Sequence, residues 1–195
     1  MTKLRPIIMR YLMLSILLIL AFLTSGCDFM QQALHLVPRD GVYLMHNGYV
    51  GPVIILYDQS DGVVPDVEGG YYVYNIPPSG VLKIRTPPYL GIVNLQYFYV
   101  DGGRERQEVK QIIITGDRDP QGRPQNKYGN LSQDEVENST FVMNPGGVGE
   151  FRVNGKPVQF SGFIIGKPKD GDKLKDEEHK KIADVQQALS NTNSF

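Results

Sequence analysis

The sequence predicts a mostly β protein, an antiparallel β-sandwich with a signal or anchor helix at the N-terminus and a short helix at the C-terminus. Two observations support this fold class. The 195 residues include 21 glycines, 13 prolines and 11 tyrosines, a composition that suits strands joined by tight turns. Short runs rich in Val, Ile, Leu and Tyr recur between these turn residues. We expect one domain with short appendages.

The first 26 residues are predicted to be a secretion signal. Residues 1–10 carry three basic side chains and no acidic one, and an apolar run of about thirteen residues follows at 11–23. A helix that crosses a bilayer needs roughly 20 apolar residues, so this run is too short for a stable membrane span. It fits the apolar core of a signal peptide.

The segment Leu23-Thr24-Ser25-Gly26-Cys27 resembles the lipobox of bacterial lipoproteins. The resemblance implies cleavage after Gly26 and transfer of a diacylglyceryl group to the Cys27 thiol, although the commonest lipobox has Leu where this chain has Thr24. Cys27 is the only cysteine, and lipidation explains an odd cysteine in a secreted chain. We therefore predict Cys27 as the lipidation site and a bacterial cell membrane location, facing the periplasm or the extracellular side.

The mature chain is predicted to have three parts. Residues 27–39, of mixed polarity and ending near Pro38, form a tether. Residues 40–170 form the β-sandwich, and 171–195 form a helical tail. The predicted strands are Gly41–Met45, Tyr49–Tyr57, Tyr71–Ile76, Gly80–Thr86, Ile92–Val100, Arg106–Thr115, Thr140–Met143, Gly149–Val153 and Val158–Ile165.

Turn residues and apolar runs predict how these strands are joined. Asn47-Gly48, Asp101-Gly102-Gly103 and Asn154-Gly155 each indicate a hairpin. The run Val53–Tyr57 is continuously apolar, as expected for a central strand covered on both faces. In the Pro77-to-Gly80 turn, Pro fixes φ and Gly permits positive φ, so we assign this turn to the scaffold.

The second half of the chain contains a long polar loop, the closing strands and the tail. Residues 115–137 form a loop long enough to be either functional or disordered. The helix predicted at Asp172–Leu189 has an apolar stripe only in its last two turns, and it is either a partly docked or free terminal helix or a partner-binding helix. The residues expected to complete the core are Phe141, Phe151, Phe160, Phe163 and Ile164.

Two stretches resemble a family of small bacterial lipoproteins and secreted proteins of uncharacterised function. They are Gly48-Tyr49-Val50-Gly51-Pro52-Val53, continuing to Asp58, and Tyr72-Val73-Tyr74-Asn75-Ile76-Pro77-Pro78-Ser79-Gly80-Val81-Leu82. The match extends to residues 97–101 and, more faintly, to Gly147 and 160–166. These motifs are structural, so the resemblance implies no catalytic residues. The same stretch is more loosely similar to transthyretin-like, or prealbumin-like, β-sandwich modules, a fold that hosts many functions.

Charge and motifs exclude several function classes. The formal charge is −1, or about −4 without the leader, and no basic stripe suits nucleic acid. His35, His46 and His179 lack the spacing of a zinc site. The sequence Asp117-x-Asp119 with Gly122 is like the start of a calcium loop but lacks the later ligands, so we interpret it as a solvated loop. No nucleophile elbow, P-loop or dinucleotide motif occurs, and no cofactor is predicted.

Two residue groups are candidates for function. Asp58, Asp61, Asp66 and Glu68 cluster in one loop and are candidates for a hydrolytic carboxylate pair, although surface loops are commonly acidic. Tyrosines also gather in neighbouring segments, where they form either an exposed interface or glycan-binding surface, or simply part of the core. The tyrosines are Tyr71, Tyr72, Tyr74, Tyr89, Tyr97 and Tyr99.

Two functional hypotheses follow from the sequence. The leading one is a membrane-anchored envelope lipoprotein, not an enzyme, whose β domain binds an envelope protein or a cell-wall component such as a glycan. The alternative is an envelope hydrolase with an acidic site in the 58–68 loop. An enzyme would require convergent polar groups in a concave pocket, which a structure reveals.

Overall fold

The computed structural model describes residues 40–88, 94–102, 105–115, 120–121 and 126–192. All of them belong to one unit of the chain, Arg39–Phe195. Several sequence predictions lie outside the described residues: the signal peptide, the tether, Cys27, His35, Tyr89, Asp117, Asp119 and Gly122.

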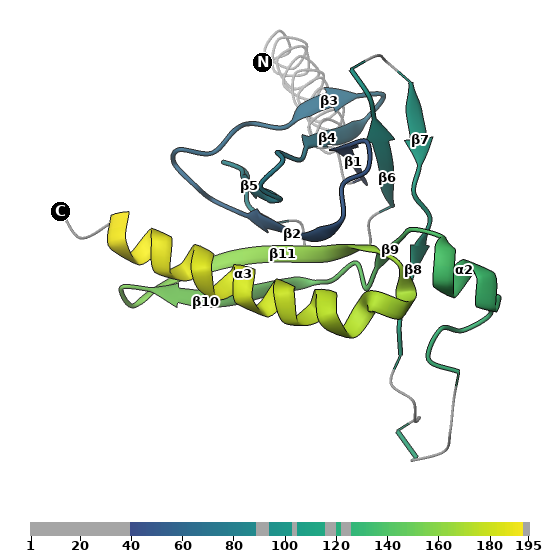
Figure 1. Cartoon of the computed structure of the whole chain (residues 1–195). Coiled ribbons are helices and arrows are strands. Elements are labelled where there is room, and N and C mark those ends of the chain that lie inside the picture. Colours follow the sequence, from purple (N-terminus) through teal and green to yellow (C-terminus); the bar gives the residue numbers. More distant parts are fainter. Residues whose placement is uncertain (1–39, 89–93, 103–104, 116–119, 122–125, 193–195) are drawn as a thin grey trace, which may run out of the picture. The chain divides into compact units, whose positions relative to one another are not determined.

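Two mixed β-sheets form a mostly β, sandwich-like arrangement, which confirms the predicted fold class (Figure 1). Sheet A has the strand order β3-β4-β1-β6-β7, and sheet B has the order β5-β2-β11-β9-β8, with β10 paired to β11. The strands of sheet A are β1 (Asp40–His46), β3 (Asp66–Glu68), β4 (Tyr71–Asn75), β6 (Leu95–Val100) and β7 (Arg106–Glu108). The strands of sheet B are β2 (Gly51–Leu56), β5 (Val81–Lys83), β8 (Gln111–Ile112), β9 (Phe141–Met143), β10 (Val148–Val153) and β11 (Lys156–Gly166).

Strand direction differs from the antiparallel prediction. The central strand β1 runs parallel to both β4 and β6, and β2 runs parallel to β5. The reason is the path of the chain, in which β2 of sheet B follows β1, and β5 of sheet B lies between β4 and β6. The chain therefore enters β1, β4 and β6 of sheet A in the same direction, and these three neighbouring strands are parallel.

The first predicted hairpin is wrong, although its turn exists. The Tyr49 N–H donates to the His46 carbonyl at 3.1 Å, and Gly48 has φ +76°. However, this turn joins β1 in sheet A to β2 in sheet B, because β4 and β6 already occupy both edges of β1. The other two hairpins are confirmed, β6 with β7 and β10 with β11.

Two other segments differ from the sequence prediction. The strand predicted at Arg106–Thr115 is two strands, β7 in sheet A and β8 in sheet B. The predicted 115–137 loop contains the start of helix α2 (Gln133–Asn138). Ser132 caps this helix, and its side chain and that of Glu135 form a reciprocal capping box.

The main core lies between the two sheets. Val53, Ile54, Ile55 and Leu56 of β2 are 0% exposed, which confirms the predicted central strand. Phe141, Phe163 and Ile164 are buried as predicted, whereas Phe151 and Phe160 are half-buried and pack on each other with ring centroids 5.4 Å apart.

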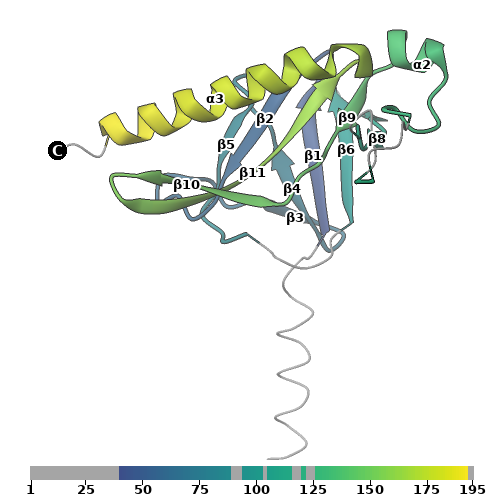
Figure 2. The ribbon, with the colours of Figure 1, turned by 90° about the horizontal axis from the view of Figure 1, so that it is seen from below.

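The C-terminal helix packs on sheet B. After a short 3₁₀ turn, η1 (Pro168–Asp170), helix α3 (Gly171–Thr192) runs along β2, β10 and β11 (Figure 2). The predicted stripe of Ile182, Val185 and Leu189 is half-buried, and Leu174 adds a fully buried contact. Docking, rather than a free helix, is therefore the interpretation that the structure supports.

Candidate functional site

A cleft of about 570 Å³ opens between the two sheets on the side of β3 and β5. Sheet A contributes Val73, Tyr74 and Asn75, and sheet B contributes residues 82–84. Asp61 and residues 63–66 also line it. We call this site the cleft, and its volume lies in the range of ordinary ligand pockets.

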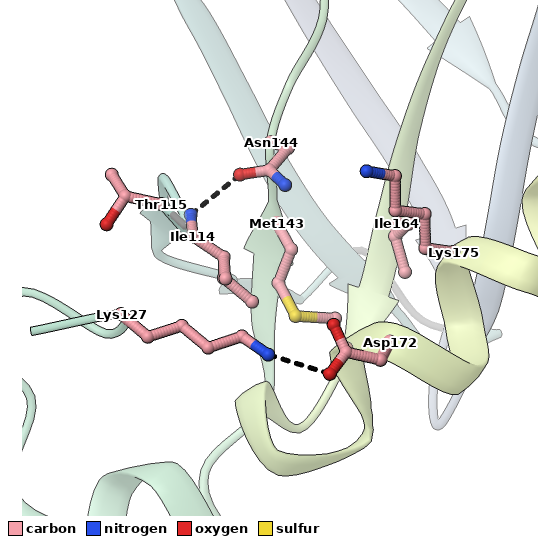
Figure 3. Close-up of a pocket in the computed structure, with 9 residues that line it drawn as sticks. Ile114, Thr115, Lys127, Met143, Asn144, Ile164, Asp172 and Lys175 are labelled. Carbon is pink, nitrogen blue, oxygen red and sulfur yellow. Dashed lines mark hydrogen bonds and ion pairs between the residues drawn. The ribbon is translucent and has the colours of Figure 1, made fainter. Parts of the chain in front are cut away.

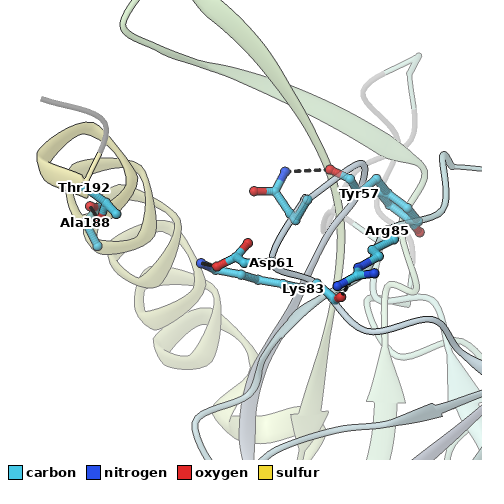
Figure 4. Close-up of polar contacts among 8 residues, drawn as sticks. Tyr57, Asp61, Lys83, Arg85, Ala188 and Thr192 are labelled. Atoms are coloured by element: carbon cyan, nitrogen blue, oxygen red, sulfur yellow. Dashed lines mark hydrogen bonds and ion pairs between the residues drawn. The ribbon is translucent and has the colours of Figure 1, made fainter. Parts of the chain in front are cut away.

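Backbone pairing fixes the 61–66 segment against sheet B. The Val63 N–H donates to the Lys83 carbonyl and the Arg85 N–H donates to the Val63 carbonyl, both at 2.9 Å. Gly62 permits this approach, because a β-carbon there would lie 2.7–2.8 Å from the backbone of Ile84. The Arg85 Nε also donates to the Gly62 carbonyl at 2.8 Å (Figure 4). Val63, which lines the cleft, is thus held by main-chain hydrogen bonds on both sides.

Apolar side chains remain exposed beside the cleft. Val63 and Val64 are 54% and 64% exposed. Val63 and Val64 line the cleft directly. Contiguous exposed apolar groups at a concave site are typical of a surface that binds another molecule.

The four acidic residues of this loop do not converge. Asp61 and Asp66 line the cleft, whereas Asp58 and Glu68 are not among its lining residues. Asp61 accepts a hydrogen bond from Lys83 Nζ at 2.7 Å (Figure 4), and Glu68 accepts one from Arg106 at 2.7 Å. The Lys83 contact lowers the pKa of Asp61. A general acid requires a raised pKa, so Asp61 is poorly suited to that role.

Three tyrosines form a stacked row across sheet A, which we call the tyrosine row. Tyr43 is in register with Tyr74 on β4 and with Tyr97 on β6. The Tyr43 ring centroid lies 4.8 Å from that of Tyr74 and 5.1 Å from that of Tyr97, with interplanar angles of 16° and 13°. Phe163 packs edge-on against Tyr43 and Tyr97 from sheet B.

The tyrosine row is core, which favours the buried interpretation over an exposed binding face. Tyr97 is 2% exposed, Tyr43 is 5% exposed, and Tyr74 is partly buried against them. Three other tyrosines that the sequence analysis considered for a binding surface are half-buried: Tyr71, Tyr72 and Tyr99.

Within the part of the chain that the structure describes, the hydroxyl groups of the row have no hydrogen-bond partner. The Tyr97 hydroxyl is fully buried, and no hydrogen-bond partner for it exists among the described residues. Burial raises the pKa of Tyr43 well above its ordinary value and also raises those of Tyr74 and Tyr97. These phenols therefore stay neutral at any physiological pH. Tyr57, on sheet B, instead shares a hydrogen bond with Ser161 Oγ at 2.8 Å.

A second pocket, of about 330 Å³, lies near the first turn of α3 (Figure 3). Lys127 Nζ and Asp172 form an ion pair of 2.7 Å across it, and the Ile114 N–H donates to Asn144 Oδ1. Lys175 also lines this pocket, but Lys127 and Asp172 are already engaged with each other, and we treat the pocket as a weaker candidate than the cleft.

The remaining predicted ligands do not gather. His46 and His179 are exposed on β1 and α3, respectively. Among the residues that the structure describes, no group of three His, Cys, Asp or Glu side chains could hold a metal ion. Within the same residues, no helix is long and apolar enough to cross a membrane.

Sequence reasoning missed Lys181, which fastens α3 to the sandwich. Its ammonium group donates to the Pro52 carbonyl at 2.7 Å and to the Ser79 carbonyl at 3.0 Å. The Tyr49 hydroxyl donates to the same Pro52 oxygen at 2.8 Å. No local pattern marks such a lysine, because its acceptors lie more than 100 residues away in the sequence.

The fold and the cleft together define a mixed β-sandwich with an open cleft between its sheets. A family model matches residues 38–144, more than half of the chain, and the chain belongs to that family, DUF6843, a family of unknown function. The match includes every strand of sheet A and all residues that line the cleft, and it ends before Gly147 and residues 160–166.

One solved structure has a similar fold. It is the crystal structure described as "Putative Lipoprotein from Bacillus anthracis", with a TM-score of 0.50 and 14% sequence identity over 78% of this chain and 95% of that chain. At this identity the similarity concerns the fold alone. No curated protein matches the chain in sequence. The looser resemblance to transthyretin-like modules stays a prediction.

Proposed function

We propose that this chain is a lipid-anchored envelope protein whose β domain is a non-catalytic binding module, with the cleft as its binding site. The observation that carries the proposal is the cleft itself. Its exposed valines offer apolar contact, and the carboxylate of Asp61 is engaged by Lys83. Such a site suits holding a ligand better than cleaving one.

The lipid anchor in this proposal rests on the lipobox-like segment and the single cysteine. The partner is an apolar part of an envelope protein or of a cell-wall component. Because the tyrosine row is buried, it no longer supports an exposed glycan-binding face. The hydrolase alternative has less support, because the four acidic side chains do not line one site.

Site-specific photo-crosslinking in cells tests the binding proposal. A photoreactive residue at Val64, which lines the cleft, is compared with one at Ile113, which is 73% exposed but does not line it. We expect a discrete adduct with an envelope component from position 64 and none from position 113. Equal adducts from both positions, or none from position 64, would contradict the proposal.

The anchor is tested separately. Cys27→Ala should abolish incorporation of a labelled fatty-acid analogue, because the thiol is the acceptor. Equal labelling of wild type and variant would show that Cys27 is not the lipidation site. The proposed binding role of the β domain would then be judged by the crosslinking experiment alone.

A further inference from the structure

The tyrosine row leads from the cleft into the sandwich. Tyr74 lines the cleft, Tyr43 stacks directly behind it, and Tyr97 stacks behind Tyr43. The three residues occupy one register level of parallel strands, so their rings extend from the sheet side by side. None of the three hydroxyl groups has a hydrogen-bond partner among the described residues.

Of the three hydroxyl groups, only that of Tyr97 is buried without a partner among the described residues, an uncommon state for a buried polar atom. Tyr97, deep in the row, is sealed by the core. Tyr74 differs, because it borders open space in the cleft. A molecule that enters the cleft could give the Tyr74 hydroxyl the partner that the protein does not supply.

The charges around the cleft restrict what can enter. Asp61 and Asp66 line it, and Lys83 is the single basic residue of the lining and is paired with Asp61. An anionic ligand would therefore meet an unpaired carboxylate at Asp66 and find no free cation. The walls formed by Val63, Val64 and Leu82 favour an apolar body.

We propose that the cleft binds a neutral amphiphile, an apolar molecule with one hydroxyl or carbonyl group that hydrogen-bonds to the Tyr74 hydroxyl. This inference rests on the proposed function of the cleft as a binding site and adds the chemical class of its occupant. An apolar peptide or an anionic lipid would be a different occupant, and the test separates them.

The test uses three probes of one shape: 2-naphthol, naphthalene and 2-naphthoate. Each is titrated calorimetrically into the full-length protein in lipid nanodiscs, with empty nanodiscs as the blank. We expect 2-naphthol to bind roughly three- to tenfold more tightly than naphthalene, the range that one net hydrogen bond contributes. The anion 2-naphthoate should bind most weakly of the three.

Two tyrosine variants locate the hydrogen bond. Tyr74→Phe keeps the stacked ring and removes only the hydroxyl, so it should abolish the advantage of 2-naphthol over naphthalene. Tyr97→Phe makes the same chemical change at the sealed end of the row and should preserve that advantage. Asp66→Asn should raise the affinity for 2-naphthoate and leave 2-naphthol unchanged.

The inference is wrong if 2-naphthol and naphthalene bind equally well, or if Tyr74→Phe still binds 2-naphthol more tightly than naphthalene. It is also wrong if 2-naphthoate binds best, or if an apolar tripeptide displaces 2-naphthol and 1-decanol does not. A further outcome is that naphthalene binds as tightly as 2-naphthol and that Val64→Asp abolishes this binding. The inference would then be wrong, but the cleft would remain a binding site. If no probe binds, the inference fails, and the crosslinking result alone decides the proposed function.

Discussion

Two polar clusters in this molecule use their hydrogen-bonding groups in opposite ways. At the corner where β4 passes to β5, which includes Gly80, the Tyr49 hydroxyl and the Lys181 ammonium both donate to the Pro52 carbonyl. In the tyrosine row, the hydroxyl groups have no partner among the described residues. Because buried polar groups are costly when unpaired, the first arrangement is what a scaffold requires. The second, at the buried Tyr97 hydroxyl, is a cost in stability.

The largest expected loss of stability comes from a substitution at the corner that includes Gly80. Gly80 has φ +71°, and a β-carbon there would collide with the Tyr49 hydroxyl and lie 2.7 Å from the Pro52 carbonyl. Gly80→Ala should therefore combine left-handed strain with overpacking and cost about 3 kcal/mol, or a fall in melting temperature of about 10 °C. Thermal unfolding followed by circular dichroism measures it.

Gly155→Ala is the matched control for the corner. Gly155 has φ +80° and nothing within 4 Å of its would-be β-carbon, so only the backbone strain remains. That variant should cost about 1 kcal/mol. If the two alanine variants melt at the same temperature, the packing of the corner contributes nothing.

The next largest loss of stability is expected when Lys181, the lysine of the corner, is replaced. Lys181→Met keeps an apolar stem but loses both hydrogen bonds to carbonyl oxygens. Partial exposure weakens these charge-assisted bonds, and we expect a loss of about 2 kcal/mol and a melting temperature lower by about 6 °C. Lys180→Met, one residue away and exposed, should change little. An equal response from both lysines would show that Lys181 does not fasten the helix.

Some of these features can be predicted from sequence, and others depend on distant parts of the chain. The continuous apolar run Val53–Leu56 correctly predicts a central strand, because burial on both faces needs no knowledge of the partners. Asn154-Gly155 correctly predicts a hairpin, with both residues at positive φ. At Asn47-Gly48 the same dipeptide gives only Gly48 a positive φ, and its strands separate into different sheets.

The candidate site was predicted only in part. The prediction that the four acidic residues share one loop is wrong for Asp66 and Glu68, which lie in strand β3. The sequence also could not show that Asp61 would pair with Lys83 or that Asp66 would line an apolar cleft. Side chains alternate between the two faces of a strand, so the sequence predicts which tyrosines share a face. It does not predict that this face is directed toward the other sheet. Register across β4, β1 and β6 creates the tyrosine row, and register is a property of the assembled sheet.

The tyrosine row predicts a mutation that stabilises the protein. Tyr97→Phe removes a buried hydroxyl without a partner while keeping both ring contacts, so the melting temperature should rise by about 3 °C, or about 1 kcal/mol. Tyr57→Phe is the opposite case, because it breaks the hydrogen bond with Ser161, and it should lower the melting temperature by a similar amount. If Tyr97→Phe destabilises the domain, the hydroxyl has a partner after all.

The smallest expected effect concerns Glu178, beneath α3. A β-carbon at Gly162 of β11 would lie 3.0 Å from its carboxylate oxygen, so the absence of a side chain at Gly162 makes room for this acid. Burial raises the pKa of Glu178, although His179 and Lys175 partly oppose the shift. Since the folded-state pKa is the higher one, the group favours folding at low pH, and that contribution is lost as pH rises through the folded-state pKa.

Glu178→Gln should therefore raise the melting temperature slightly at pH 7, because the neutral amide avoids the cost of burying a charge. The difference should shrink as pH falls toward 4, where the wild-type carboxyl becomes protonated. Glu177→Gln is the control, since Glu177 is exposed and lies 3.8 Å from Lys173. Melting curves from pH 4 to pH 8 measure both variants. A pH-independent shift would show that ionisation of Glu178 does not cause the difference. A lower melting temperature at pH 7 would show that contacts of the ionised carboxylate outweigh the cost of its burial.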